Sequence, residues 1–344
     1  MIYIFLGIFI NFFCFLRIVA RYRVEVVEWV FILSLIYIST FRSAYVGSDT
    51  ITYLEFFKLS PDIFNFDNNY LSYLEPGFRL YMSVIKAFSS TQESFLFISS
   101  LFCILPLYFG LKRLKLEYSL VGLMVFLMVF FIPYPLNGLR QAIAMSLFVY
   151  SLSFFNDKKI IPIALLTILA STIHVSGVFI IFSYLLYALD YKKSILLCIL
   201  SLALFVFISY FGLAQYILFD LGRVDADVYT GIYNEETSIT QYVYRLILIF
   251  LIAFFTFRQD NLFLKKIFIV YFFGFFIYLV LSENNMLATR FNMFFRVLEV
   301  IIFPLILSSI NVISRLFVFI LLSILFFFVY YTTSIFPENI YQFQ

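Results

Sequence analysis

The chain is poor in charge, in histidine and in cysteine. Charged residues make up 12 % of its 344 residues, whereas soluble domains carry about 25 %. Hydrophobic residues make up 64 %, and the mean hydropathy is +1.02. Because a soluble fold cannot bury this much apolar surface, the composition predicts an integral membrane protein.

The small numbers of cysteine and histidine, and the absence of phosphate-binding and basic motifs, exclude several classes of function. The three cysteines, Cys14, Cys103 and Cys198, lie far apart within apolar runs, which indicates helix packing and not a disulfide or zinc framework. The chain has no glycine-rich phosphate loop, and no basic block that favours nucleic acid as a partner. With one histidine we expect no bound metal and no cofactor, although Asp225-Ala226-Asp227 formally matches an Asp-x-Asp metal signature.

Hydrophobic blocks fill nearly the whole length and predict an all-α, polytopic transmembrane helix bundle with about twelve crossings. They form a single membrane domain over residues 1–344. The blocks fall at about 2–16, 27–41, 94–111, 118–135, 138–155, 160–173, 175–189, 194–212, 243–257, 267–282, 291–309 and 315–332. A further block, 77–90, follows Glu75-Pro76 and contains Arg79 and Lys86. It is interpreted as a re-entrant or interfacial helix, with a full crossing as the alternative.

The positive-inside rule orients these crossings. The clusters that it places in the cytoplasm are Arg17/Arg21/Arg23, Lys112/Arg113/Lys115, Lys158/Lys159, Lys192/Lys193, Arg258/Lys265/Lys266 and Arg315. The opposite side then receives two acidic loops, at about 42–76 and 213–242. A multi-pass protein of a bacterial inner membrane, with its active face outside the cytoplasm, fits this pattern.

Polar residues at the outer helix ends predict a pocket. Arg140, His174 and Arg290 lie at helix ends or within apolar sequence, where a solvated charge is not required. The simpler alternative is that outer loops need some polar residues. A convergent polar pocket on the outer face explains their positions better.

Each pocket residue has a structural and a functional interpretation. Asp49 either caps the helix that starts near Thr50 or is a reactive carboxylate. Glu75 is either a solvated or capping residue or a general base. Arg140, in the first turn of a helix, needs an anion nearby, which is either an acidic side chain or a substrate phosphate. His174 is either a structural residue or a base or hydrogen-bond donor.

Four short motifs follow one another along the chain. They are Arg42-x4-Gly47-x-Asp49-Thr50-x2-Tyr53, Glu75-Pro76-Gly77-Phe78, Asn137-Gly138-x-Arg140-Gln141-x2-Ala144 and Ser171-x2-His174-x-Ser176. This order resembles the EpsG/Wzy group of bacterial polysaccharide polymerases over about residues 40–185. The C-terminal half is similar only in its hydrophobicity, its long outer loop and the helix start at Thr289-Arg290. Thr50 stands where the group usually has tyrosine or asparagine.

The resemblance implies a GT-C-like glycosyltransferase. Such enzymes join oligosaccharide repeat units carried on undecaprenyl pyrophosphate, and so make O-antigen, capsule or exopolysaccharide. Membrane lipid and a chain-length regulator are further partners of that setting. The residues expected to bind substrate are Arg42, Arg140, Gln141, Arg290 and Tyr53, with the three arginines on the pyrophosphate. The base candidates are His174, Asp49 and Glu75.

Two other functions suit a bundle with a polar pocket. A flippase for lipid-linked oligosaccharides needs charged groups along a path to both faces, whereas here they gather on one face. An O-antigen ligase has a large outer loop, whereas the loop here has about 30 residues, and the motif order favours the polymerase.

Overall fold

The computed structural model describes residues 2–22, 24–66, 70–210, 238–282 and 284–343, and the regular elements in these ranges are helices. The chain divides into two compact units. Unit 1 comprises Met1–Ile181 and Glu299–Gln344, and unit 2 comprises Phe182–Leu298. Most of the predicted loop 213–242, including Asp225 and Asp227, lies outside the described residues.

Five of the described helices are long and apolar enough to cross a membrane. They are α1 (Ile2–Ala20), α5 (Gln92–Arg113), α13 (Ile239–Phe257), α14 (Leu262–Val280) and α17 (Val312–Ser334). Counting α15 (Asn285–Arg296) and α16 (Glu299–Ser309) as one bent span gives six. The all-helical membrane architecture is thus confirmed.

The predicted count of about twelve crossings is not confirmed. Several expected spans form shorter apolar helices, at Ser119–Phe131, Leu139–Phe154, Ile160–Ile173 and Val175–Ala188. The predicted blocks match the bounds of these helices within a few residues. The count of crossings differs because helices of 10–17 residues are shorter than the hydrocarbon core. The GT-C-like architecture stays a prediction.

The helices of unit 1 pack through their apolar faces. α2 (Glu25–Thr40) and α7 (Leu139–Ser151) pack against α5, and α8 (Ile160–Ile173) packs against α7. α1 packs against α17 and against α6 (Ser119–Val125), which continues into a π-helical segment, Phe126–Phe131.

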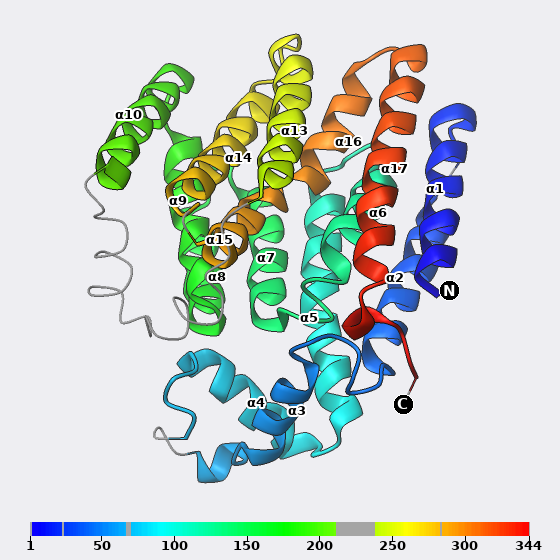
Figure 1. Ribbon diagram of the computed structural model, residues 1–344, viewed down its shortest axis with the longest axis vertical. Coiled ribbons are helices and arrows are strands. Elements are labelled where there is room, and N and C mark those ends of the chain that lie inside the picture. The colour runs from blue at the N-terminus through cyan, green and yellow to red at the C-terminus, as the bar shows by residue number, and fades with distance from the viewer. Residues whose placement is uncertain (1, 23, 67–69, 211–237, 283, 344) are drawn as a thin grey trace. The chain divides into compact units, whose positions relative to one another are not determined.

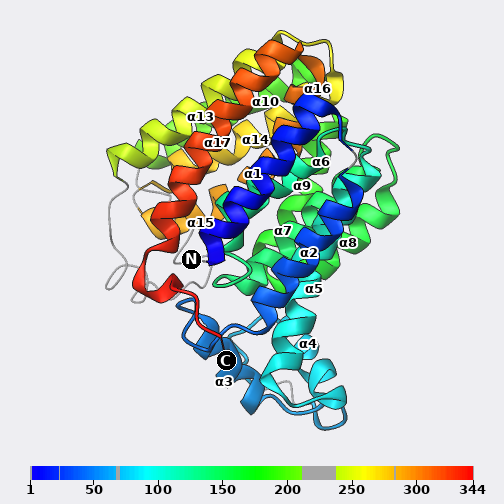
Figure 2. The ribbon, with the colours of Figure 1, turned by 90° about the vertical axis from the view of Figure 1, so that its right-hand side faces the viewer.

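Two short helices, α3 (Thr50–Leu59) and α4 (Pro76–Phe88), lie together at one end of unit 1, beside the first turns of α5 (Figures 1 and 2). With 13 residues, α4 is about 20 Å long at 1.5 Å per residue, which is too short to cross the hydrocarbon core of about 30 Å. The structure therefore agrees with the interpretation that this block does not cross.

The other end of unit 1 collects basic side chains, and we call it the basic end. The guanidinium groups of Arg17 and Arg315 lie 5.9 and 4.9 Å from the ring centre of Tyr118. The guanidinium of Arg113 lies 4.3 Å from the ring centre of Phe154. Phe154 is followed in the sequence by Lys158 and Lys159. Clusters that the positive-inside rule assigns to one side of the membrane thus meet at one end of this unit.

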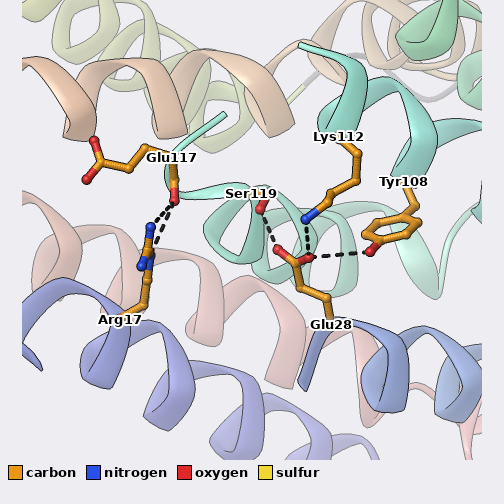
Figure 3. A network of polar contacts seen from close by, with 6 residues as sticks. All are labelled: Arg17, Glu28, Tyr108, Lys112, Glu117 and Ser119. Atoms are coloured by element: carbon orange, nitrogen blue, oxygen red, sulfur yellow. Dashed lines mark hydrogen bonds and ion pairs between the residues drawn. The ribbon is translucent and has the colours of Figure 1, made fainter. Parts of the chain in front are cut away.

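A buried carboxylate fastens three helices at the basic end (Figure 3). Glu28 of α2 is fully buried, and its Oε2 lies 3.0 Å from Nζ of Lys112 on α5. It also accepts hydrogen bonds from the hydroxyl groups of Ser119 on α6 and Tyr108 on α5. A buried carboxylate is stable only with such partners, so this cluster fixes how α2, α5 and α6 meet.

Unit 2 is built around α14, which packs against α10 (Tyr191–Tyr210), α13 and α15. Most of α9 (Phe179–Ala188) also belongs to it. Arg245 of α13 is buried, and its guanidinium lies 3.8 Å from the ring centre of Tyr278. It donates to Asn292 Oδ1 at 3.0 Å and to Thr289 Oγ1 at 3.3 Å, which joins α13 to α15.

Replacing Glu28 by alanine should lower the free energy of unfolding by about 3 kcal/mol, because removing one partner of a buried ion pair costs about 3–5 kcal/mol and Lys112, which is partly exposed, can turn to solvent. Thermal unfolding of the purified protein in detergent measures the change. Glu25→Ala, at an exposed position of the same helix, is the control and should change stability by less than about 0.5 kcal/mol. Equal losses in both variants would contradict the role of the cluster.

Candidate active site

The first motif is held down by backbone contacts. Gly47 has φ +89°, and a Cβ there would lie 2.1 Å from the carbonyl oxygen of Leu136, so only glycine fits this turn. The amide of Gly47 donates to the carbonyl oxygen of Glu338 at 2.7 Å, and that of Ser43 donates to Gln342 at 2.8 Å. The motif thus lies between the turn before α7 and the C-terminal segment of unit 1.

Arg42 lies in the interior, with 1 % of its surface exposed. It donates to the carbonyl oxygen of Ser39 at 2.5 Å and to Oγ1 of Thr50 at 3.4 Å. Burial lowers the pKa of Arg42 to about 10, which still leaves the guanidinium charged at neutral pH. Nε and Nη1 of this buried side chain thus bond to the protein, and the role of Arg42 as a pyrophosphate ligand stays a prediction.

Asp49 does not cap α3, although it occupies the capping position. Its side chain makes no bond to the helix amides. Instead, Oδ1 lies 3.1 Å from the hydroxyl of Ser48, which lies equally far from Oδ1 of Asn137. The carboxylate is therefore positioned beside the turn that leads into α7, and the capping interpretation is wrong.

Arg140 forms an ion pair with Glu75, and each side chain keeps about a quarter of its surface exposed (24 % and 22 %). The Tyr53 side chain also forms a hydrogen bond with Arg140, whose guanidinium lies 5.7 Å from the ring centre of Phe78. Arg140 stands in the first turn of α7, where the helix dipole disfavours a positive charge. Of the two anions left open by the sequence, the structure contains the acidic side chain.

Glu75 also reaches the fourth motif. Its Oε1 accepts a hydrogen bond of 3.4 Å from the amide of Val175. Two residues further on, Gly77 meets α8 so closely that a Cβ would lie 2.7 Å from the carbonyl oxygen of Thr172. The carboxylate thus lies where the N-termini of α4 and α7 meet the turn after α8.

His174 has a defined hydrogen-bonding role. Its Nδ1 accepts from the amide of Ser176 at 3.2 Å and lies 2.7 Å from the hydroxyl of the same serine. A backbone N–H can only donate, so Nδ1 carries no proton and the neutral ring carries its proton on Nε2. In this tautomer Nε2 is a hydrogen-bond donor.

The described residues of unit 1 therefore bring together all four motifs, which are spread over residues 42–176. Gln141, next to Arg140, is buried within α7. Arg290 lies on the exposed side of α15 and belongs to unit 2. Among the described residues, no group of three or more His, Cys, Asp or Glu side chains could hold a metal ion.

Sequence analysis missed three contributors to the site: the amide of Val175, the hydroxyl of Ser48 and the ring of Phe78. All three residues lie inside the quoted motifs, so the motifs gave their positions in the sequence but not their roles. Their roles required the geometry, because a backbone amide and a ring face carry no signal in sequence.

Gly77→Ala should separate α4 from α8, because the added methyl group meets the backbone of Thr172 and overpacking typically costs about 1–3 kcal/mol. Thermal unfolding in detergent measures the loss. Gly138→Ala is the matched control, since the nearest atom to its Cβ is 3.4 Å away, an ordinary contact. A stable Gly77→Ala protein would show that this helix contact yields easily.

Comparison with known proteins assigns the chain to a family. Neither a search of curated proteins nor a search of solved structures gave a match. The family model described as EpsG family matches residues 25–344, which includes all four motifs. Since this match covers nearly the whole chain, the protein belongs to the EpsG family.

Proposed function

We propose that this protein is a membrane glycosyltransferase of the polymerase type. It joins oligosaccharide repeat units that are carried on undecaprenyl pyrophosphate, at the outer face of a bacterial inner membrane. Membership of the EpsG family supports a role in polysaccharide synthesis. The observation that carries the proposal is the position of the Glu75 carboxylate on Arg140 and on the amide of Val175.

In this proposal, the Glu75 carboxylate occupies the place that a phosphate oxygen takes when substrate binds. A guanidinium, a backbone amide and the N-terminus of α7 are donors that suit a diphosphate as well as a carboxylate. Nε of Arg140 is buried and has no hydrogen-bond partner among the described residues, so the protein alone does not satisfy all the donors of this guanidinium. The diphosphate, with more charge and more oxygens, displaces the carboxylate.

Displacement frees Glu75 to act as the general base. The hydroxyl of the acceptor sugar loses its proton to Glu75 as its oxygen bonds to the anomeric carbon of the donor. The bond from that carbon to the diphosphate oxygen breaks, and the electron pair leaves with the diphosphate, whose charge Arg140 neutralises. The bond to diphosphate is already activated, so the reaction needs no ATP.

The other candidates take supporting roles. His174 is assigned the role of a donor through Nε2, because its Nδ1 is used by Ser176. Asp49 is the alternative base, since it lies beside Asn137 and does not cap its helix. Tyr53 holds Arg140. The assignments of Gln141 and Arg290 to substrate binding stay predictions. Arg42 stabilises the loop that carries Asp49.

The distribution of charge supports the location in this proposal. The positive-inside rule favours a cytoplasmic side for the basic end of unit 1, and the motifs lie at the opposite end. In the proposal, lipid-linked repeat units are used at the extracytoplasmic boundary.

Arg140→Ala should reduce chain elongation by about 100-fold, the usual cost of removing one donor to a developing negative charge. The assay uses purified protein in detergent with lipid-diphosphate oligosaccharide, and gels report chain length. Arg140→Lys should retain part of the activity, since an ammonium keeps the charge but loses the planar fork.

Arg258→Ala, an exposed arginine of unit 2, is the matched control and should give normal ladders. Normal ladders from Arg140→Ala would overturn the site. Detergent micelles offer no second leaflet, so elongation in them also separates a polymerase from a flippase.

Glu75→Gln should bind donor but elongate about 100-fold more slowly, because glutamine still accepts hydrogen bonds from Arg140 and Val175 but is no general base. Donor binding is measured separately, by native mass spectrometry. Asp49→Asn should have the smaller effect. The reverse order of the two variants would assign the base to Asp49.

A further inference from the structure

We call the end of unit 1 that carries the four motifs the motif end. The short helices that lead to it from the basic end do not span the hydrocarbon core of a membrane. α8 has 14 residues and is about 21 Å long, whereas the hydrocarbon core is about 30 Å thick. Its first residue follows Lys159 at the basic end, and His174 follows its last. If the basic end lies at one boundary, His174 lies about 9 Å inside the other.

Other parts of unit 1 extend beyond His174. α5 has 22 residues and is about 33 Å long, and α3 and α4 pack against its first turns (Figure 2). The hydroxyl of Tyr81 on α4 lies 3.0 Å from that of Ser99 on α5, and the rings of Phe57 on α3 and Phe95 on α5 stack with centres 4.8 Å apart.

α4 buries Phe78, Met82 and Ile85 against the protein and carries a second set of apolar side chains on its outward side. Leu80, Val84 and Phe88, each four residues apart, form an outward apolar stripe, with 44 %, 36 % and 85 % of their surfaces exposed. The two charged residues of the helix turn inward. Arg79 donates to the carbonyl oxygen of Tyr70 at 3.1 Å, and Lys86 donates to that of Lys58 at 2.6 Å.

Such an arrangement suits lipid. In water a helix buries its apolar stripe and exposes its charges, whereas in lipid a charge must find partners inside the protein. The stripe also adjoins the lipid-facing side of α5, because Tyr81 packs against the half-exposed Phe102 at 5.7 Å between ring centres. α3, in contrast, exposes Glu55 and Lys58 and therefore has a side toward water.

We infer that α4 is embedded in the membrane leaflet at the motif end, with lipid acyl chains covering Leu80, Val84 and Phe88. α3 and α4 then complete the thickness that α7 and α8 lack. Glu75, which precedes α4, consequently lies below the headgroups and inside the leaflet. This inference is independent of the reaction that the site performs.

Tryptophan fluorescence tests the inference. The chain has one tryptophan, Trp29, which is replaced by phenylalanine to give a silent background. Val84→Trp and Leu80→Trp then report the stripe, and Glu55→Trp reports the water side of α3. The proteins are reconstituted in vesicles of phosphatidylcholine with brominated acyl chains, and fluorescence is compared with unbrominated vesicles.

We expect both stripe tryptophans to emit at short wavelength and to lose most of their fluorescence to brominated lipid, while the tryptophan at 55 is quenched by aqueous iodide instead. Iodide quenching at 80 and 84 would place the stripe in water and overturn the inference. Quenching by neither reagent would show that protein covers the stripe, which also overturns it. Thermal unfolding in the background without Trp29 confirms that each variant is folded.

Discussion

The ion pair between Glu75 and Arg140 is the contact on which the arrangement of the motif end depends. A guanidinium in the first turn of α7 opposes the helix dipole, and a partly buried carboxylate is costly without donors. Each group thus compensates the other, and the amide of Val175 adds the turn after α8 to the same carboxylate. Three segments that lie up to 100 residues apart are joined at a single side chain.

The two ends of unit 1 use carboxylates in different ways. At the basic end, Glu28 is fully buried, and Lys112, Ser119 and Tyr108 surround it, so it serves the packing of three helices. At the motif end, Glu75 keeps 22 % of its side chain exposed, and it bonds to groups that would also suit a phosphate. Accessibility, and not the presence of an ion pair, separates the structural carboxylate from the candidate for chemistry.

The sequence predicted the membrane class and the helical architecture, because composition carries that information directly, and its short motifs contain the residues that lie around Arg140. It left open whether an acidic residue or a phosphate compensates Arg140, and the structure shows Glu75. It did not predict the burial of Arg42, since an arginine at a helix end looks the same whether its donors point inward or outward. The hydrophobic blocks predicted the bounds of the short helices within a few residues, but the count of about twelve crossings is not confirmed, because helices of 10–17 residues are shorter than the hydrocarbon core.

The C-terminal segment of unit 1 has a consequence for how the protein is made. The carbonyl oxygens of Glu338 and Gln342 accept hydrogen bonds from the amides of Gly47 and Ser43. The Asn137 side chain donates to Oδ1 of Asn339. A chain emerging from the ribosome therefore carries its first motif through membrane insertion without these supports. The turn can reach its final geometry only after residues 338–342 have been synthesised and have packed against it, so the order of assembly along the chain leaves the first motif without these contacts until late.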